Sequence, residues 1–216
     1  MAVSRAEQAV AEGAEAVLEP GLHLGRPVLR KRRLPKTYRH AALDRRLRDE
    51  RTRDEGNLLL AAARAGVRVP ILYDADRRGA TLSLERIDGP LLRDVLPGDD
   101  EATACARMEA LGRMVARLHD AGVTHGDLTT SNVLVEDPAD PAALVLIDFG
   151  LGQSTREEEP RGVDLHLVEE ALEATDDRAG ALVAAFLAGY RTADCAQGSL
   201  RRLEQIRLRG RYREAV

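Results

Sequence analysis

Two short apolar segments, Val133–Val135 and Leu144–Ile147, constrain the fold most strongly, because three chemically distinctive residues flank them. Asp127 and Asn132 precede the first segment, and Asp148 directly follows the second. The β-branched and leucine-rich composition of both segments predicts strands. We therefore expect two strands at hairpin distance that hold the three polar residues in fixed positions.

These residue types suit phosphoryl transfer, which depends on positioned carboxylates, metal ions and cations more than on covalent help from the protein. In that chemistry Asp127 would be the catalytic carboxylate near an incoming hydroxyl or water, while Asn132 and Asp148 would bind a metal ion. Magnesium needs only one or two carboxylates besides phosphate oxygens, so this set is sufficient. Each residue alone would more often belong to a turn or a helix cap, but together they predict a site for ATP and Mg²⁺.

Length and composition favour a cytoplasmic, globular protein. A chain of 216 residues with 44% apolar residues can form one medium domain or two small lobes. No apolar run approaches the ~20 residues that cross a bilayer, and the first residues lack the apolar core of a secretory signal. Cys105 and Cys195 are too few for a disulfide framework or a four-ligand metal site, so we expect both to be reduced.

The chain changes character at the segment Ile87-Asp88-Gly89-Pro90, where a lobe boundary is expected. Residues 1–87 predict a helix and several short strands, one of them Ala9–Leu18, bounded by the Pro20-Gly21 pair. Residues 88–216 are mainly helical in pattern. We expect an α+β protein with a small antiparallel-sheet lobe at 1–87 and a reduced helical lobe at 88–216.

Positive charge is concentrated in two regions of this chain. Arg26 to Arg53 holds twelve Lys or Arg residues against three acids, and Arg191 to Val216 holds seven Arg against three acids. A solvated helix surface explains such clusters, and so does attraction to the phosphates of a nucleic acid. Charge alone leaves both interpretations open.

Lysine is rare here, since only Lys31 and Lys36 are lysines among the 32 basic residues. A lysine in such a background suggests a position that needs a compact ammonium rather than a guanidinium fork. Chance is the alternative explanation.

The HGDxxxxN motif from His125 and the DFG motif from Asp148 resemble those of the protein-kinase-like superfamily. The resemblance implies that Lys31, at the end of a short strand, grips the α and β phosphates of ATP, and that Glu55 in the following helix is its ion-pair partner. In the same frame, backbone groups of Glu85 and Ile87 would meet the adenine.

Several departures from that superfamily narrow the resemblance. The glycine-rich loop is reduced to Gly13-Ala14-Glu15-Ala16, so Gly13 is expected to cover the ATP phosphates only through a less flexible turn. Gly126 replaces the arginine that usually precedes the catalytic aspartate and reads a phosphorylated loop. Only 13 residues, Leu151 to Val163, separate Gly150 from Asp164, with no Ala-Pro-Glu element. A broad peptide-kinase role is therefore doubtful.

The whole pattern is similar to the small atypical kinase subunit of the KEOPS complex, which makes threonylcarbamoyladenosine in tRNA. That family implies a serine/threonine-type kinase or ATPase that binds a transferase subunit and a small bridging subunit, with tRNA within the complex. It also suggests that the arginine-rich tail touches tRNA. The similarity rests on these blocks: GAEA from Gly13, KRRLPKTYRH from Lys31, LDRRLRDERTRDE from Leu43, GVRVP from Gly66, LERIDG from Leu84, HGDLTTSN from His125, IDFG from Ile147, GVDL from Gly162 and RLRGRYR from Arg207.

Two alternatives remain at this stage. A small-molecule phosphotransferase of the aminoglycoside or choline type shares HGD and IDFG, although it usually has a larger acidic C-terminal lobe. A catalytically idle scaffold is the other, although such a protein would be free to lose Lys31, Asp127, Asn132 and Asp148.

Overall fold

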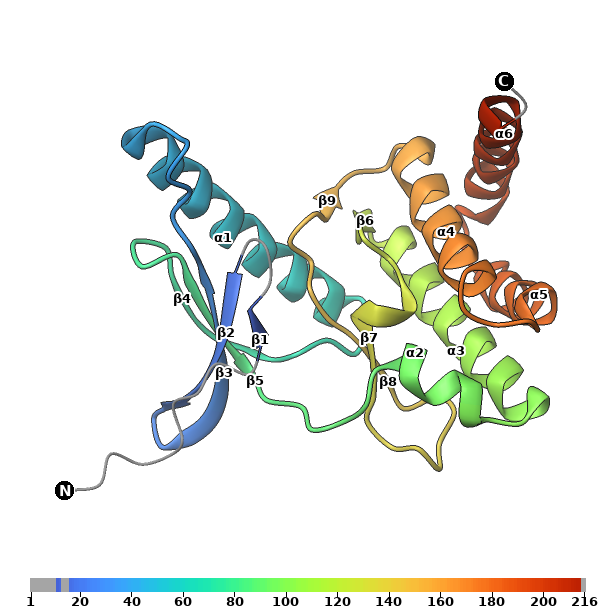
Figure 1. Cartoon of the computed structure of the whole chain (residues 1–216), viewed down its shortest axis with the longest axis horizontal. Helices are drawn as coiled ribbons and strands as arrows, with labels where there is room; N and C mark the ends of the chain where they lie inside the picture. The colour runs from blue at the N-terminus through green and yellow to red at the C-terminus, as the bar shows by residue number, and fades with distance from the viewer. Residues whose placement is uncertain (1–10, 13–15, 215–216) are drawn as a thin grey trace. The chain divides into compact units, whose positions relative to one another are not determined.

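The computed structural model describes residues 11–12 and 16–214 (Figure 1). They divide into two compact units. The first contains the residues up to Leu60 together with 70–87, and the second contains 61–69 and the chain from Asp88 onward.

An antiparallel sheet is the centre of the first unit (Figure 1). Its strand order is β1-β2-β3-β5-β4, and β3 pairs with β5 so that Lys31 lies opposite Leu82. Leu82 and Leu84 are buried on one face of the sheet, and Val28 is buried on the opposite face. The strands are β1 (Ala11–Glu12), β2 (Ala16–His23), β3 (Arg26–Arg33), β4 (Leu72–Asp76) and β5 (Thr81–Glu85).

Strand β2 runs through Pro20 and Gly21, where the sequence suggested a boundary. Pro20 lies opposite Leu29 in the ladder with β3. The described part of β1 pairs only with Val17 and Leu18, so β2 has β3 as its neighbour at Pro20. A proline is tolerated on such an edge, because its missing N–H removes no ladder hydrogen bond there.

Helix α1 (Ala41–Arg64) packs on this sheet through small and apolar residues. A Cβ atom at Gly56 would lie 3.3 Å from Leu72 Cδ2, so the helix approaches the sheet closely at that point. Leu58 and Leu59 are buried in the following turn. After the helix, Gly66 adopts a φ of +73°, which favours glycine and ends the helical path.

The second unit is mainly helical (Figure 1). Its most extensive helix–helix packing is between α3 and α5, where Gly112 and Gly189 allow the two backbones to approach closely. A Cβ atom at Gly112 would overlap the carbonyl oxygen of Phe186, and one at Gly189 would overlap that of Glu109. The elements are α2 (Leu92–Val95), η1 (Leu96–Gly98), α3 (Glu101–Asp120), β6 (Val123–Thr124), η2 (Thr130–Asn132), β7 (Val133–Val135), β8 (Leu144–Leu146), β9 (Gln153–Ser154), α4 (Glu158–Glu173), α5 (Ala179–Tyr190) and α6 (Ala196–Glu214).

The expected fold class is confirmed, since a small antiparallel sheet characterises the first unit and helices dominate the second. The predicted hairpin is also present: β7 and β8 pair antiparallel, with Val133 opposite Leu146. This hairpin positions the polar residues that flank it.

Candidate active site

The hairpin brings Asn132 and the start of the Asp148 segment together. Asn132 immediately precedes β7, and its carbonyl accepts a hydrogen bond from the backbone N–H of Ile147 at 3.0 Å. The Asn132 amide nitrogen donates to the Asp127 carbonyl at 2.7 Å and to the Asp127 carboxylate at 2.9 Å. Both amide hydrogens are thereby directed at Asp127, which turns the amide oxygen of Asn132 the other way.

Asp148 has a special backbone conformation within its motif. Its φ is 62°, in the left-handed region that aspartate enters more readily than most residues. The Asp148 carboxylate accepts a hydrogen bond from the Gly150 N–H at 3.0 Å, which supports this turn. Phe149 is buried against the ring of His125, with centroids 4.7 Å apart. The turn therefore exposes the acid and buries the aromatic ring.

Asp164, in α4, holds the backbone of the loop that carries Asp127. Its carboxylate accepts hydrogen bonds from the N–H groups of His125 at 2.6 Å and Gly126 at 2.8 Å. The Asp164 side chain is fully buried, so these charge-assisted bonds are not exposed to water. The sequence did not predict this role of Asp164, which entered only as the end of a spacing. The one sequence signal for the role was the place of Asp164 in the GVDL block.

A buried network extends from Asp164 to α5. His119 lies 3.1 Å from the Asp164 carboxylate through Nε2 and 2.8 Å from the Tyr190 hydroxyl through Nδ1. Burial raises the pKa of Tyr190, so its hydroxyl stays protonated. The network connects the loop to three helices, α3, α4 and α5.

Steric crowding explains why position 126 is a glycine. Its φ is +80°, and an added Cβ would overlap the carbonyl oxygen of Leu151. A side chain at this position would therefore displace the segment that follows Gly150. The same loop is fixed at His125, whose Nε2 lies 2.9 Å from the Ile147 carbonyl.

In the first unit, Lys31 and Glu55 form a buried ion pair. Lys31 Nζ lies 2.7 Å from Glu55 Oε1, and the two residues are 8% and 2% exposed. Arg33 also reaches this carboxylate, with its NH2 group 2.5 Å from Glu55 Oε2. Glu55 thus holds two cations of strand β3, and sequence reasoning had assigned it only one.

The residues expected to meet adenine lie at the end of the sheet. The Glu85 N–H donates to the Ile71 carbonyl at 2.8 Å, and the Glu85 carboxylate accepts from the Ile71 N–H at 3.1 Å. The amide of Glu85 is therefore used within the sheet. Ile87 follows as a half-buried residue. Gly13 lies outside the described residues.

The donor set fits magnesium better than a metal held in a protein cage. Among the residues that the structure describes, no three His, Cys, Asp or Glu side chains form a metal-binding group. One carboxylate and one amide oxygen beside it, from Asp148 and Asn132, match an ion that takes most of its ligands from phosphate and water. No helix in the described ranges is both long and apolar enough to cross a membrane.

Known proteins have sequences similar to this chain. The lipopolysaccharide kinase (Kdo/WaaP) family matches residues 17–190. The EKC/KEOPS complex subunit Tp53rkb of Mus musculus is 36% identical over 214 residues, which cover 96% of this chain and 88% of the mouse protein. The chain belongs to the Kdo/WaaP family and to the family of this EKC/KEOPS subunit.

Archaeal members of the EKC/KEOPS subunit family are longer. The probable bifunctional tRNA threonylcarbamoyladenosine biosynthesis protein of Methanoculleus marisnigri is 44% identical over 207 residues, which cover 95% of this chain. The chain spans 36% of the length of that protein. The family resemblance expected from the sequence is confirmed.

Solved structures confirm that this chain has a kinase-like fold. WaaP, solved in complex with acyl carrier protein, superposes with a TM-score of 0.63 at 17% identity over 92% of this chain and 87% of that chain. The Rio2 kinase of Chaetomium thermophilum, solved as an ADP/Mg²⁺-phosphoaspartate complex, gives a TM-score of 0.61 at 19% identity. The superposition covers 90% of this chain and 69% of the Rio2 chain. The protein is therefore a protein-kinase-like enzyme in family and fold.

Proposed function

We propose that this chain binds ATP with Mg²⁺ and transfers or hydrolyses the terminal phosphate in support of tRNA threonylcarbamoyladenosine formation. The observation that carries the proposal is the pair of hydrogen bonds from the Asn132 amide to Asp127. They fix the catalytic carboxylate and direct the amide oxygen of Asn132 away from it. The backbone bond between Ile147 and Asn132 holds the Asp148 segment next to Asn132.

Each residue has a definite task in this proposal. Mg²⁺, when bound, neutralises charge that develops on the transferred phosphate. Asn132 and Asp148 supply its two protein oxygens, and Lys31, oriented by Glu55, holds the α and β phosphates. Asp127 accepts the proton of, or orients, the attacking hydroxyl or water.

The adenine end of the ATP site is assigned to backbone groups. The Glu85 N–H is bonded to Ile71, and we assign the Glu85 carbonyl to the adenine amine. The backbone of Ile87 supplies the second contact, and Gly13 is assigned to phosphate cover as the sequence suggests.

The family relationship supports the biological setting. Its members are named for tRNA threonylcarbamoyladenosine biosynthesis and for the EKC/KEOPS complex. We therefore assign a transferase subunit and a small bridging subunit as partners, with tRNA as the substrate of the complex. We assign the protein to the cytoplasm, with the chemistry of a serine/threonine-type kinase or an ATPase.

ATP turnover by purified protein in Mg²⁺ tests the proposal. Wild type is expected to hydrolyse ATP, and faster once the transferase subunit and tRNA are added. Asp127→Ala should lower turnover by roughly 10²- to 10⁴-fold, because it removes the group that handles the proton. Asp137→Ala is the matched control, since Asp137 is an exposed turn acid whose side chain accepts only from Ala139. Equal and negligible turnover in all three would leave a scaffold role instead.

Two further measurements separate the rival functions. Asp148→Asn should raise the Mg²⁺ concentration needed for half-maximal turnover, because one charged oxygen ligand is lost. A screen of aminoglycosides, choline and sugars should show no rapid ATP-dependent phosphorylation. Rapid turnover of any of these compounds would favour a small-molecule phosphotransferase.

A further inference from the structure

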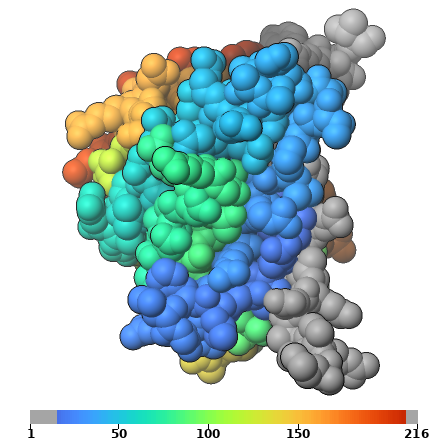
Figure 2. Space-filling view, turned by 90° about the vertical axis from the view of Figure 1, so that its left-hand side faces the viewer, coloured from blue at the N-terminus to red at the C-terminus, as the bar shows by residue number. Residues whose placement is uncertain are grey.

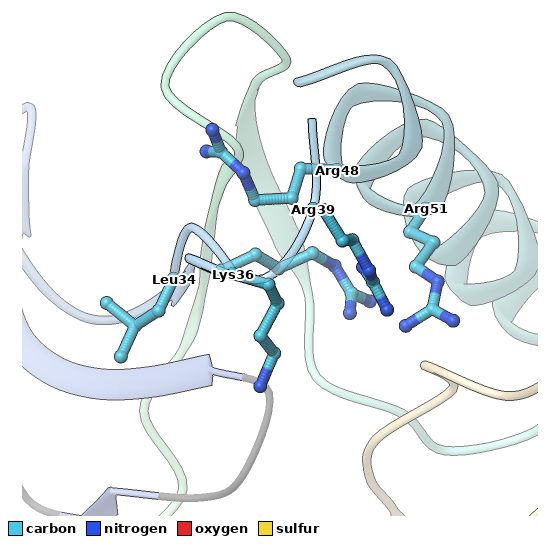
Figure 3. Close-up of a pocket in the computed structure, with 6 residues that line it drawn as sticks. Leu34, Lys36, Arg39, Arg48 and Arg51 are labelled. Atoms are coloured by element: carbon cyan, nitrogen blue, oxygen red, sulfur yellow. The ribbon is translucent and has the colours of Figure 1, made fainter. Parts of the chain in front are cut away.

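A hollow beside the first half of α1 is lined almost entirely by cations (Figure 3). None of the six lining residues that the structure describes is acidic. Figure 3 shows Lys36 entering from the loop before the helix, and Arg51 from the helix itself. The lining residues are Arg33, Leu34, Lys36, Arg39, Arg48 and Arg51.

One buried carboxylate organises this cationic cluster. Asp44 is 3% exposed and accepts hydrogen bonds from Arg48 Nε at 2.7 Å and from the Lys36 N–H at 3.2 Å. Arg39 lies 4.0 Å from the same carboxylate. Asp44 therefore attaches the loop to the helix and holds the cations at their positions. Of the five cations that line the hollow, Arg39 and Arg48 face Asp44, and Arg33 is paired with Glu55.

A second hollow on a neighbouring face of α1 continues the positive surface. Four of its lining residues are arginines, from the helix and from the turn between β4 and β5. Figure 2 shows the first turns of α1 beside the β4–β5 hairpin on one face of the molecule. Arg77 is bonded to Asp49 at 2.7 Å and 2.9 Å, which joins the hairpin to the helix. Its lining residues are Ala42, Arg45, Arg46, Asp49, Arg77 and Arg78.

We propose that these two hollows on helix α1 form one binding surface for the phosphate backbone of RNA. Guanidinium groups match phosphate oxygens with two parallel hydrogen bonds, and arginine supplies eight of the nine cations that line the hollows. Two cationic hollows on one helix fit a chain with repeated phosphates better than a single phosphoryl group. Among the described residues no aromatic side chain lines either hollow, and the Tyr38 ring beside the first hollow is in contact with the Arg39 guanidinium, so we assign the surface to backbone contacts.

RNA as the polyanion follows from the proposed role in tRNA modification, and the inference rests on that role. Such a surface positions the ligand without reading its sequence, because phosphates are the same along every chain. Its affinity must therefore fall steeply with salt, as bound cations release condensed counterions from the RNA.

Binding of a labelled tRNA transcript to the full chain, measured by fluorescence anisotropy at several salt concentrations, tests the inference. The test variant is Arg39→Gln/Arg51→Gln, which removes two charges from the first hollow. Its affinity should be about tenfold lower at low salt, and its slope of log K against log salt should be shallower by about 1 to 2. The control is Arg113→Gln/Arg117→Gln, which removes two exposed charges from α3 and should leave both quantities unchanged.

Three other results would overturn the inference. Equal slopes in wild type and both variants would mean that RNA does not bind at these hollows. Equal losses in both variants would mean that RNA responds only to net charge. A singly phosphorylated peptide that binds wild type and not the test variant, with tRNA binding unchanged, would assign the first hollow to a phosphorylated protein.

ATP turnover without RNA, measured on the same preparations, separates this inference from the proposed function. Turnover by wild type combined with equal RNA slopes would reject only the RNA surface. Slopes that depend on Arg39 and Arg51, combined with no turnover, would reject only phosphoryl transfer. Matching urea midpoints for the variants would show that the folded state is intact.

Discussion

The two arginine-rich regions of this chain have similar compositions and very different surroundings. Around the start of α1, basic side chains line two hollows that have few carboxylates among their described lining residues. Along α6, the arginines face acids of α4: Arg202 lies 2.7 Å from Glu159, and Arg207 makes a two-bond contact with Glu169. Arg209 also reaches Glu159, at 3.0 Å.

The difference shows that arginine content has two unrelated uses in one small protein. Matched pairs along α6 attach the last helix to α4, where Glu169 raises the pKa of Arg207 by hydrogen bonding. Around α1, basic side chains outnumber the carboxylates among the described residues that line the two hollows. We therefore expect changes at α6 to affect folding and changes at α1 to affect ligand binding.

The largest effect on stability is expected from Glu169→Ala. Glu169 is 4% exposed, and its loss leaves Arg207 without its two-bond partner. Arg207 is 30% exposed, so water compensates in part, and the free energy of unfolding should fall by about 2 kcal/mol. Urea unfolding followed by circular dichroism measures this change.

A surface pair on α3 provides the control for that measurement. Glu109 and Arg113 are ion-paired four residues apart, but their side chains are 47% and 43% exposed. Glu109→Ala should change stability by less than about 0.5 kcal/mol. If both substitutions cost the same, the α4–α6 pairs would be ordinary surface ion pairs and the comparison between the two regions would fail.

The sequence predicted the hairpin around the candidate site, where the contacts are local. Asp127, Asn132 and Asp148 flank two short strands, and the hairpin itself brings Asn132 next to the Asp148 segment. The pairing of Lys31 with Glu55 came from family resemblance, because no local pattern links residues 24 positions apart.

Long-range contacts were the part that sequence patterns could not supply. Asp164 bonds the backbone of a loop 38 residues earlier, and Arg33 shares Glu55 with Lys31. The contact of the tail with tRNA stays a prediction, and the sequence did not indicate that Arg207 is paired with Glu169 of α4. Which face of α6 meets α4 depends on packing, and composition carries no information about packing.

A second prediction concerns the carboxylate that organises the α1 cluster. The Arg48 side chain and the Lys36 N–H hold the pKa of Asp44 below its ordinary value. Because the folded-state pKa is lowered, Asp44 stabilises the protein above about pH 4, and this stabilisation is lost as pH falls through the folded pKa. Asp44→Asn should therefore lower the urea midpoint at pH 7, and the difference from wild type should shrink on acidification.

Asp49→Asn is the matched control on the same helix. Hydrogen bonding to Arg77 also lowers the pKa of Asp49, but the Asp49 side chain is 34% exposed. Its replacement should change the urea midpoint less than that of Asp44 at pH 7. A constant deficit for Asp44→Asn at every pH would show that the residue acts through packing and not through its charge.

The smallest effect on stability should come from Arg39→Gln/Arg51→Gln, the pair of changes with the largest effect on RNA binding. Arg39 lies 4.0 Å from Asp44, at the limit of an ion pair. When Arg39 is replaced, Asp44 keeps its bond to Arg48. Removing two of several neighbouring cations also relieves repulsion, which offsets the lost contacts. The free energy of unfolding should stay within about 0.5 kcal/mol of wild type, and the same urea experiment measures it. A loss as large as that of Glu169→Ala would mean that the α1 arginines hold the fold together as those of α6 do, and that the excess of charge around α1 has a structural role.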